Sequence, residues 1–301
     1  MSKSTRKLKY LYRLMYFLRL AGQKLNLTGA KEIASSDEDM AKLKLNRNYP
    51  LGIKGTEIQL PKDKIIFQFI RLRGGWELKE SRFLANELKR LSTSEKSEKI
   101  ALIDIGANVG IVTLQAMNLA KTSNACIFFE PSSLNASSLK KNLSNSHFKF
   151  TVNEFALSNF DGEATLYTEG SNRGNSSLIE ALVPISEKSS EKVKIRDTRE
   201  FFNFELTSFN IFIIKCDTQG YDALILSRIP PIAWNKVNAA VIEVWALPSI
   251  KELDVKILLS KLSEFSSVSW DSDFNSNLDL DNLAKFWLSK TSESRNLFIR
   301  K

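Results

Sequence analysis

Residues 100–110, with the sequence IALIDIGANVG, form an apolar run that leads directly into a turn with glycines at positions 106 and 110. Such a run predicts a buried strand, and glycine lets the backbone after it turn sharply and approach a ligand closely. A second apolar run, Ala125 to Phe129, ends in Glu130, twenty residues after Gly110. Together these segments predict a nucleoside-binding crevice, in which the carboxylate at the second strand end binds a ribose diol.

The spacing of the glycines indicates which nucleoside fits. A dinucleotide fingerprint has three glycines that cradle a pyrophosphate, whereas this turn has only Gly106 and Gly110, with Asp104 before them. A buried acid beside the turn suits a cationic ligand better than a phosphate. S-adenosylmethionine has a ribose, an ammonium and a sulfonium and no phosphate, so it is the expected cofactor.

Strand-like and helix-like patterns alternate along the rest of the chain. Strands are expected at 100–105, 125–129, 148–155, 211–216 and 239–244, followed by 268–270 and 297–300. Helices are expected at 76–91, 111–121, 132–143, 221–227 and 251–265. This alternation is typical of parallel strands joined by right-handed helical crossovers. The predicted fold is therefore α/β, a Rossmann-like, doubly wound, mostly parallel sheet of about seven strands.

Charge separates the N-terminal fifty residues from the rest. Residues 1–50 contain eleven Lys or Arg against four Asp or Glu, a balance of +7 out of a net +9. We expect a basic helical arm and linker at 1–50 and one domain at 51–301. Within that domain, 51–99 form a hairpin and helix, 100–248 the cofactor-binding core and 249–301 the completion of the sheet. Because the body is nearly neutral, no nucleic-acid partner is expected.

Two segments of the N-terminal region have recognisable patterns. Residues 6–20 fit an amphipathic helix, which either lies on a membrane surface or docks on its own domain or on a second subunit. Residues 56–60 and 65–70 flank Pro61-Lys62-Asp63-Lys64 and predict a β-hairpin.

Composition argues against several classes of protein. No run of 18 or more apolar residues occurs, so no membrane-spanning helix is expected. Charges interrupt the first twenty residues, so no cleavable export signal is expected either. Cys126 and Cys216 both lie in predicted strands and fit buried free thiols in a reducing compartment. The expected localisation is cytoplasmic, at the inner face of the membrane if residues 6–20 bind lipid.

Ligands of an open wound sheet bind beyond the carboxyl ends of its strands, so the residues there are the candidate site. Four carboxylates end predicted strands: Asp104, Glu130, Asp217 and Glu243. Asp104 is expected to meet the methionine ammonium directly or through water, Glu130 the ribose, and Asp217 the point where cofactor and substrate meet. Asn108 either supplies the left-handed backbone of the turn or contacts the ligand. Glu77 either caps the helix at 76–91 or reaches the cofactor.

Several motifs resemble, in order and as a set, the FkbM-type S-adenosylmethionine-dependent methyltransferases, a class I methyltransferase family. The resemblance runs from about Gly75 to Glu243. It is carried by DIGANVG at 104–110, Glu130-Pro131, Asn142, ALSN at 156–159, SSL at 176–178 and KCDTQGYD at 215–222. One departure is Asp222, where the family more often has glutamate, so the side chain has a shorter reach toward a metal or substrate.

The resemblance implies methyl transfer to oxygen, on a hydroxyl of a sugar, glycan or secondary metabolite. The acceptor hydroxyl must lose its proton, and a strand-end carboxylate within hydrogen-bond reach can take it. We expect Asp217 in that role, with Glu243 second. Lys215 lies two residues before Asp217 on the same side of a strand, where it either pairs with that acid or extends along the sheet edge. No His or Cys cluster indicates a metal, and none is expected.

Acceptor selection is expected from parts outside the core motifs. These are the Trp76-Glu77 region, a flexible loop at 170–177 with Arg173, and Trp270 and Trp287, whose rings either line a pocket or belong to the core. Two alternatives to this function are an RNA methyltransferase recruited by the basic arm and a non-catalytic, membrane-associated protein with a vestigial fold. The expected partner is a small-molecule or glycan acceptor.

Overall fold

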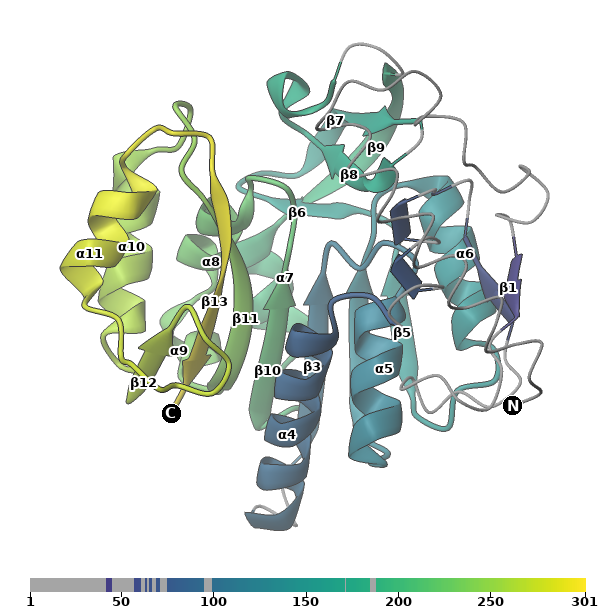
Figure 1. Ribbon diagram of the computed structural model, residues 1–301, viewed down its shortest axis with the longest axis horizontal. Helices are drawn as coiled ribbons and strands as arrows, with labels where there is room; N and C mark the ends of the chain where they lie inside the picture. The colour runs from purple at the N-terminus through teal and green to yellow at the C-terminus, as the bar shows by residue number, and fades with distance from the viewer. Residues whose placement is uncertain are drawn as a thin grey trace, which may run out of the picture.

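The computed structural model describes residues 42–44, 57–60, 63, 65–66, 69–70, 75–94, 99–170, 172–184 and 188–301. A seven-stranded sheet forms its centre (Figure 1). The strand order is β12 (Ser267–Ser269), β13 (Ser294–Arg300), β11 (Val237–Trp245), β10 (Ile211–Cys216), β3 (Ile100–Ile105), β4 (Ala125–Phe129) and β5 (Phe150–Asn153). The neighbours from β5 to β11 pair in parallel, whereas β13 runs antiparallel to both β11 and β12.

The chain starts this sheet in its middle. From β3 it winds outward to β4 and β5, and it then returns to the other side of β3 to add β10 and β11. The order therefore reverses between β3 and β10, which is the place where wound sheets bind their ligands. The predicted doubly wound, Rossmann-like α/β fold is confirmed.

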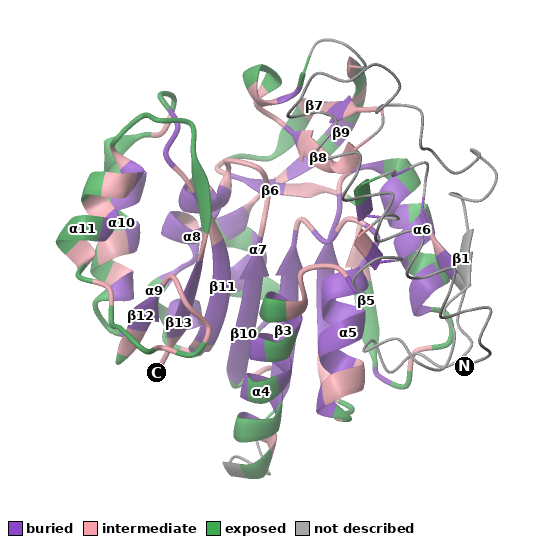
Figure 2. Cartoon of the chain, in the orientation of Figure 1, coloured by how far each residue is buried: buried purple, intermediate pink, exposed green. Residues whose placement is uncertain are grey.

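Helices cover both faces of the sheet (Figure 1). One face carries α4 (Leu78–Ser94), α5 (Ile111–Ala120) and α6 (Ser133–Leu143). The other carries α7 (Thr198–Phe204), α8 (Asp222–Arg228), α9 (Pro231–Trp234), α10 (Glu252–Leu262) and α11 (Leu280–Trp287). Strand residues alternate between the two cores, so that Leu102 packs on the first and Ile103 on the second. The central strands are buried throughout, and solvent reaches mainly the outer helix faces (Figure 2).

A second, four-stranded sheet is inserted between β5 and β10 (Figure 1). Its strands, in order, are β6 (Ala156–Ser158), β9 (Lys188–Asp197), β7 (Gly162–Glu169) and β8 (Asn172–Ser177), and a short helix, η1 (Glu180–Leu182), follows β8. The predicted loop at 170–177 is wrong, since β8 occupies most of it and pairs with β7 through Asn172, Ser176 and Ser177. The backbone ladder supplies this pairing, and the Thr168 and Ser176 hydroxyls hydrogen-bond across it at 3.1 Å. A strand of Asn, Gly and Ser therefore forms without an apolar pattern.

The N-terminal hairpin is also wrong. β2 (Glu57–Gln59) pairs antiparallel with β1 (Lys42–Lys44), inside the predicted linker, and not with 65–70. Ile66 and Ile70, in the predicted second strand, are helical and buried instead. The Asn142 side chain on α6 accepts from the Gln59 N–H at 2.7 Å and so ties β2 to the domain. The predicted helix at 6–20 lies outside the described residues.

The other predicted strands and helices are present with ends shifted by a few residues. Helices α7, α9 and α11 and strand β6 are additions to the prediction. Cys126 and Cys216 are buried free thiols on β4 and β10, which are separated by β3. Among the described residues, no helix has the length and apolar character needed to cross a membrane.

Candidate functional site

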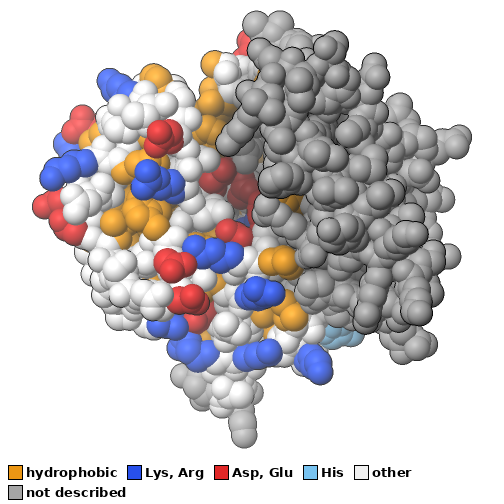
Figure 3. All heavy atoms as spheres, viewed as in Figure 1, with side chains coloured by type: hydrophobic (Ala, Val, Ile, Leu, Met, Phe, Trp, Pro, Cys, Tyr) orange, Lys and Arg blue, Asp and Glu red, His pale blue; other side chains and the backbone are white. Residues whose placement is uncertain are grey.

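Two cavities meet at the carboxyl ends of β3 and β10. The first, the apolar cavity, has walls formed by Ile105, Phe129, Pro131, Ala156, Leu157, Leu166, Leu178 and Ile225, with Glu130, Asn135, Arg173 and Thr218 among its polar groups. The second, the acidic cavity, is lined by Trp76, Glu77, Lys215, Glu243, Asn172, Asn175 and Asn296, among others. Gly106, Asn108, Gly174, Asp217 and Gln219 line both. Acidic side chains lie in the hollow at the middle of the face shown in Figure 3.

The glycine turn holds the junction of the cavities open. Gly106 has φ 77° and Asn108 φ 51°, so both use the left-handed region. A Cβ on Gly106 would lie 1.9 Å from the backbone oxygen of Asp217, which only glycine avoids. Gly110, at φ 79°, precedes α5, and a Cβ there would lie 2.3 Å from Leu139 Cδ1. Gly110, which the sequence predicts among the cofactor-binding glycines, therefore packs against α6 and lines neither cavity.

Glu130 lies in the apolar cavity, where the sequence predicts it. Its Oε2 accepts from the Asn108 N–H at 2.7 Å, and its Oε1 accepts from the Ser132 N–H at 2.9 Å. Burial raises the pKa of Glu130 to about 7, although these backbone hydrogen bonds oppose the rise. The Asn135 side chain hydrogen-bonds to the same carboxylate, whose two oxygens together have about four lone-pair sites, so one is left for a ligand hydroxyl.

Asp104 is less accessible than predicted. Its side chain is 1% exposed, and Oδ2 accepts from the Thr113 hydroxyl at 2.7 Å. Oδ1 lies 3.2 Å from Lys215 Nζ, and Asp104 and Lys215 are Cα partners across β3 and β10. Asp104 therefore pairs with a cation of the protein itself, Lys215, and lines neither cavity.

Lys215 is a buried ammonium that also donates to the Gly106 carbonyl at 3.2 Å and lies 3.9 Å from Asp217 Oδ2. Burial alone would lower its pKa, but the carboxylates of Asp104, Asp217 and Glu77 outweigh burial and raise it above the ordinary value. Of the two alternatives for Lys215, the structure has the ion pair, and the closer partner is Asp104 rather than Asp217.

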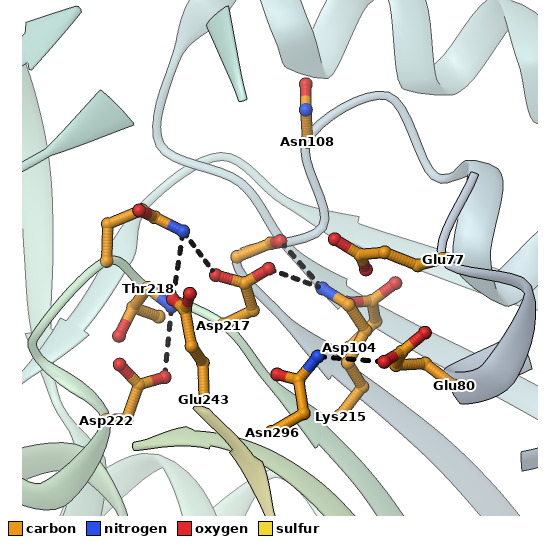
Figure 4. Close-up of polar contacts among 12 residues, drawn as sticks. Glu77, Glu80, Asp104, Asn108, Lys215, Asp217, Thr218, Asp222, Glu243 and Asn296 are labelled. Carbon is orange, nitrogen blue, oxygen red and sulfur yellow. Dashed lines mark hydrogen bonds and ion pairs between the residues drawn. The ribbon is translucent and has the colours of Figure 1, made fainter. Parts of the chain in front are cut away.

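Asp217 and Glu243, the two predicted catalytic carboxylates, are brought together by one side chain. Gln219 Nε2 donates to Asp217 Oδ1 at 2.8 Å and to Glu243 Oε2 at 2.9 Å (Figure 4). The Trp245 indole N–H donates to the same Glu243 oxygen at 2.6 Å. Burial and then the neighbouring Asp217 raise the pKa of Glu243 well above its ordinary value. This arrangement leaves Asp217 Oδ2 on the side of Lys215.

Glu77 extends the acidic group from the turn before α4. It has φ 44°, a left-handed conformation that is unusual for a glutamate. Its carboxylate points toward Asp217 and Lys215 in Figure 4, and none of the described residues donates a hydrogen bond to it. Burial and then Asp217 raise the pKa of Glu77 to about 8. Nearby, Glu80 Oε1 accepts from Asn296 Nδ2 at 2.8 Å, which joins α4 to β13.

Asp222 has a structural role. Its two carboxylate oxygens accept from the backbone N–H groups of Thr218, at 3.0 Å, and Gly220, at 3.2 Å. Burial and then Asp217 raise its pKa to about 6. The shorter aspartate thus closes the turn between β10 and α8 and lines neither cavity. In the described part of the chain, no group of His, Cys, Asp and Glu side chains could hold a metal ion.

The structure also places the remaining residues predicted to select the acceptor, and two site residues that were not predicted. Trp287 is 1% exposed and belongs to the core, which is the second of the two alternatives for its ring. Trp270 packs on Phe286 and lines neither cavity, whereas Arg173 lines the apolar one. Sequence reasoning assigned no role to Gln219 or Asn296. Their amides carry no pattern of their own, and only strand register brings Asn296 opposite Glu243.

The polar groups of the apolar cavity fit the adenosine half of the expected cofactor. Three of its buried polar atoms, Thr218 Oγ1, Arg173 Nε and Asn135 Oδ1, have no hydrogen-bond partner among the described residues. Buried polar groups are normally paired, so unpaired ones on residues that line a cavity need an explanation, and a bound ligand supplies one. The apolar walls suit a planar base and Glu130 suits a ribose, while the acidic cavity offers carboxylates to an ammonium.

Comparisons with known proteins find likeness in structure alone. No family model matches the chain, and no curated protein matches it in sequence. Among solved structures, it is similar to a precorrin-6y C5,15-methyltransferase from Geobacter metallireducens, at 11% identity, over 71% of this chain and 88% of that one, with a TM-score of 0.31. It is similar also to a geranyl diphosphate methyltransferase bound to GPP and sinefungin, at 10% identity, over 77% and 81%, with a TM-score of 0.35.

A third similar structure is the plantazolicin methyltransferase BpumL in complex with SAH, at 10% identity, over 75% of this chain and 86% of that one, with a TM-score of 0.33. These likenesses are too distant to assign a substrate or a reaction. The Rossmann-like fold rests on this chain's own strand order, and the function rests on its site.

Proposed function

We propose that the protein is an S-adenosylmethionine-dependent O-methyltransferase that acts on a hydroxyl of a sugar, glycan or secondary metabolite. One observation carries the proposal. An apolar cavity with a ribose-binding carboxylate and an acidic cavity meet at Gly106 and Asp217, where the strand order of the sheet reverses. The FkbM-type resemblance in the sequence points the same way.

The proposed roles of the residues follow from their places. Glu130 binds the ribose hydroxyls, and the walls of the apolar cavity hold the base. Glu77 and Asp217 face the ammonium and sulfonium, while Asp104 acts indirectly by fixing Lys215. Asp217 Oδ2 is the oxygen that takes the acceptor proton, since Gln219 already occupies Oδ1. Glu243 is linked to Asp217 through Gln219, which donates a hydrogen bond to each carboxylate.

The bound cofactor supplies an electrophilic methyl group, and the protein supplies position. In-line attack requires the acceptor oxygen to face the methyl group, so holding both in neighbouring cavities provides much of the rate. Asn296, Asn172 and Asn175 offer neutral amides to the acceptor in the acidic cavity. Amides of this kind suit a polyhydroxylated ligand, and carboxylates at the same place disfavour the phosphates of RNA.

A thermal-shift measurement tests the proposal. A ligand that binds only the folded state raises the unfolding temperature, so S-adenosylmethionine should do so while NAD and ATP, which need a phosphate cradle, should not. Transfer of a labelled methyl group to members of a panel of methyl glycosides then tests the acceptor class. No shift at saturating S-adenosylmethionine would overturn the function as a whole.

A further inference from the structure

The charges in the acidic cavity are unbalanced. Three carboxylates line it, those of Glu77, Asp217 and Glu243, and Lys215 is the single cationic side chain among its described lining residues. Lys215 carries one positive charge and shares it between Asp104, at 3.2 Å, and Asp217, at 3.9 Å. When its three carboxylates are ionised, the cavity therefore has negative charge that the described part of the protein leaves uncompensated.

The position of Asp217 decides which atom of a cofactor meets this charge. In S-adenosylmethionine the sulfur joins the ribose to the amino-acid chain. If the nucleoside occupies the apolar cavity and the amino acid the acidic one, the sulfur lies at their junction, where Asp217 lines both. Glu77 and Glu243 flank that junction, and Gln219 holds two of the three carboxylates together.

Methyl transfer changes the charge at this point. The sulfur–methyl bond breaks as the oxygen–methyl bond forms, and the bonding pair stays on sulfur, which turns from a sulfonium into a neutral thioether. The acceptor hydroxyl releases one proton, which a carboxylate takes. The carboxylates thus face a fixed cation before transfer, and after it they keep their charge balance only by holding the proton.

We propose that Asp217, Glu77 and Glu243 form a charge sensor that binds the methylated cofactor more tightly than the demethylated product, S-adenosylhomocysteine. This inference rests on the proposed function. Product release is thereby coupled to loss of the acceptor proton, because the deprotonated carboxylates attract the sulfonium of the next cofactor, whereas the sulfur of the product is neutral.

The surrounding groups set the pH range of this selectivity. The charged groups around Asp217 are Lys215 on β10, Asp104 on β3, Glu77 and Glu80 at α4, Glu243 on β11, Asp222 in the α8 turn, and Glu130 and Arg173 in the apolar cavity. Burial raises the pKa of Glu77 to about 8 and that of Glu243 in the same direction. Selectivity for the cation should therefore increase as pH rises through this range.

Isothermal titration of the full chain with three ligands tests the inference. S-adenosylmethionine and sinefungin both present a cation at the junction, whereas S-adenosylhomocysteine presents a neutral sulfur. At about pH 8.5 we expect both cations to bind about tenfold or more tightly than the product, with the ratio falling toward one near about pH 6. Titration in two buffers of different ionisation enthalpy should show more protons released with the cations.

Matched variants locate the effect. Glu77→Gln and Glu243→Gln should each reduce the preference for the cations, whereas Glu163→Gln, at an exposed position on β7, should keep it. Two variants on different elements keep the test decisive if one fails to fold. If none of the three ligands binds, the proposed function itself fails. If the product binds as tightly as S-adenosylmethionine across the pH range, the sensor is overturned and the function stands.

Discussion

The two cavities differ in what holds their carboxylates. In the apolar cavity the backbone holds Glu130, through the N–H groups of Asn108, in the turn after β3, and Ser132, after β4. In the acidic cavity side chains hold Asp217 and Glu243, through Gln219 and Trp245. A carboxylate fixed by backbone is part of the fold, whereas one fixed by side chains can be exchanged without rebuilding a loop. The first arrangement suits the ribose of the proposed cofactor, and the second suits the place where that cofactor meets its acceptor.

The largest expected effect is on the buried ion pair beneath the acidic cavity. Lys215→Met leaves Asp104 buried without its cation, and breaking such a pair from one side costs about 3–5 kcal/mol of unfolding free energy. Urea denaturation measures the loss. Lys256→Met, which breaks the exposed ion pair with Glu252, is the control and should change stability little. A loss for Lys215→Met no larger than the control's would show that this pair does not support the site.

The junction of the cavities is the next test. Gly106→Ala should cost about 1–3 kcal/mol from its left-handed backbone alone, and the collision with Asp217 should abolish binding of S-adenosylmethionine. Gly174 lines the same junction, but a Cβ there meets nothing closer than 3.4 Å, so Gly174→Ala should fold normally. Circular dichroism and thermal shift compare the two. Equal behaviour would contradict the view that Gly106 is a conformational requirement.

Replacing Glu130 and Glu243 in turn by glutamine distinguishes a carboxylate held by backbone N–H groups from one held by side chains. Glu130→Gln places an amide N–H against a backbone N–H, and an unsatisfied buried group of this kind costs about 1–3 kcal/mol. Glu243→Gln keeps a carbonyl oxygen for both Gln219 and Trp245, which share one oxygen, and should be nearly neutral. Chemical denaturation of both variants measures the two losses of stability. A larger loss for Glu243→Gln than for Glu130→Gln would refute the contrast.

The smallest expected effect is on the pH dependence of the ligand-free protein. The pKa of Glu77 rises from its ordinary 4.5 to about 8 in the folded state, so folding favours the protonated acid. Its stabilising contribution is complete below about pH 4.5 and is lost as pH rises through about 8. The unfolding temperature should therefore fall over this range, and Glu77→Gln should flatten the decline. An unchanged slope in the variant would contradict this.

Sequence predicts the centre of this molecule better than its surroundings. The strands β3, β4 and β10 have the expected ends, because buried parallel strands are continuous apolar runs between polar turns. β8 and the pairing of β1 with β2 were missed for the opposite reason. A half-exposed strand of Asn, Gly and Ser has no apolar period, and its pairing depends on a partner that local sequence does not specify.

The same limit applies to the site. Glu130, Asp217 and Glu243 were predicted because strand ends converge in a wound sheet. The pairing of Asp104 with Lys215 was not predicted, since it depends on the register that places the two residues side by side. Gln219 and Asn296 are visible only once side chains from different strands are placed in space. The sequence indicates which residues are charged and which lie at strand ends, whereas only the structure shows which side chains pair with one another.

The hydrogen bond between Glu80 and Asn296 joins residues 216 positions apart in the chain, across the rim of the acidic cavity. Closing so large a loop is entropically costly, and contacts of this kind form late in folding. β13 must also insert between β11 and β12 before Asn296 reaches its place. The part of the cavity formed by the turn after β3 and by β10 can therefore exist in a partly folded chain that cannot yet bind an acceptor. Recovery of ligand binding during refolding should lag behind recovery of secondary structure.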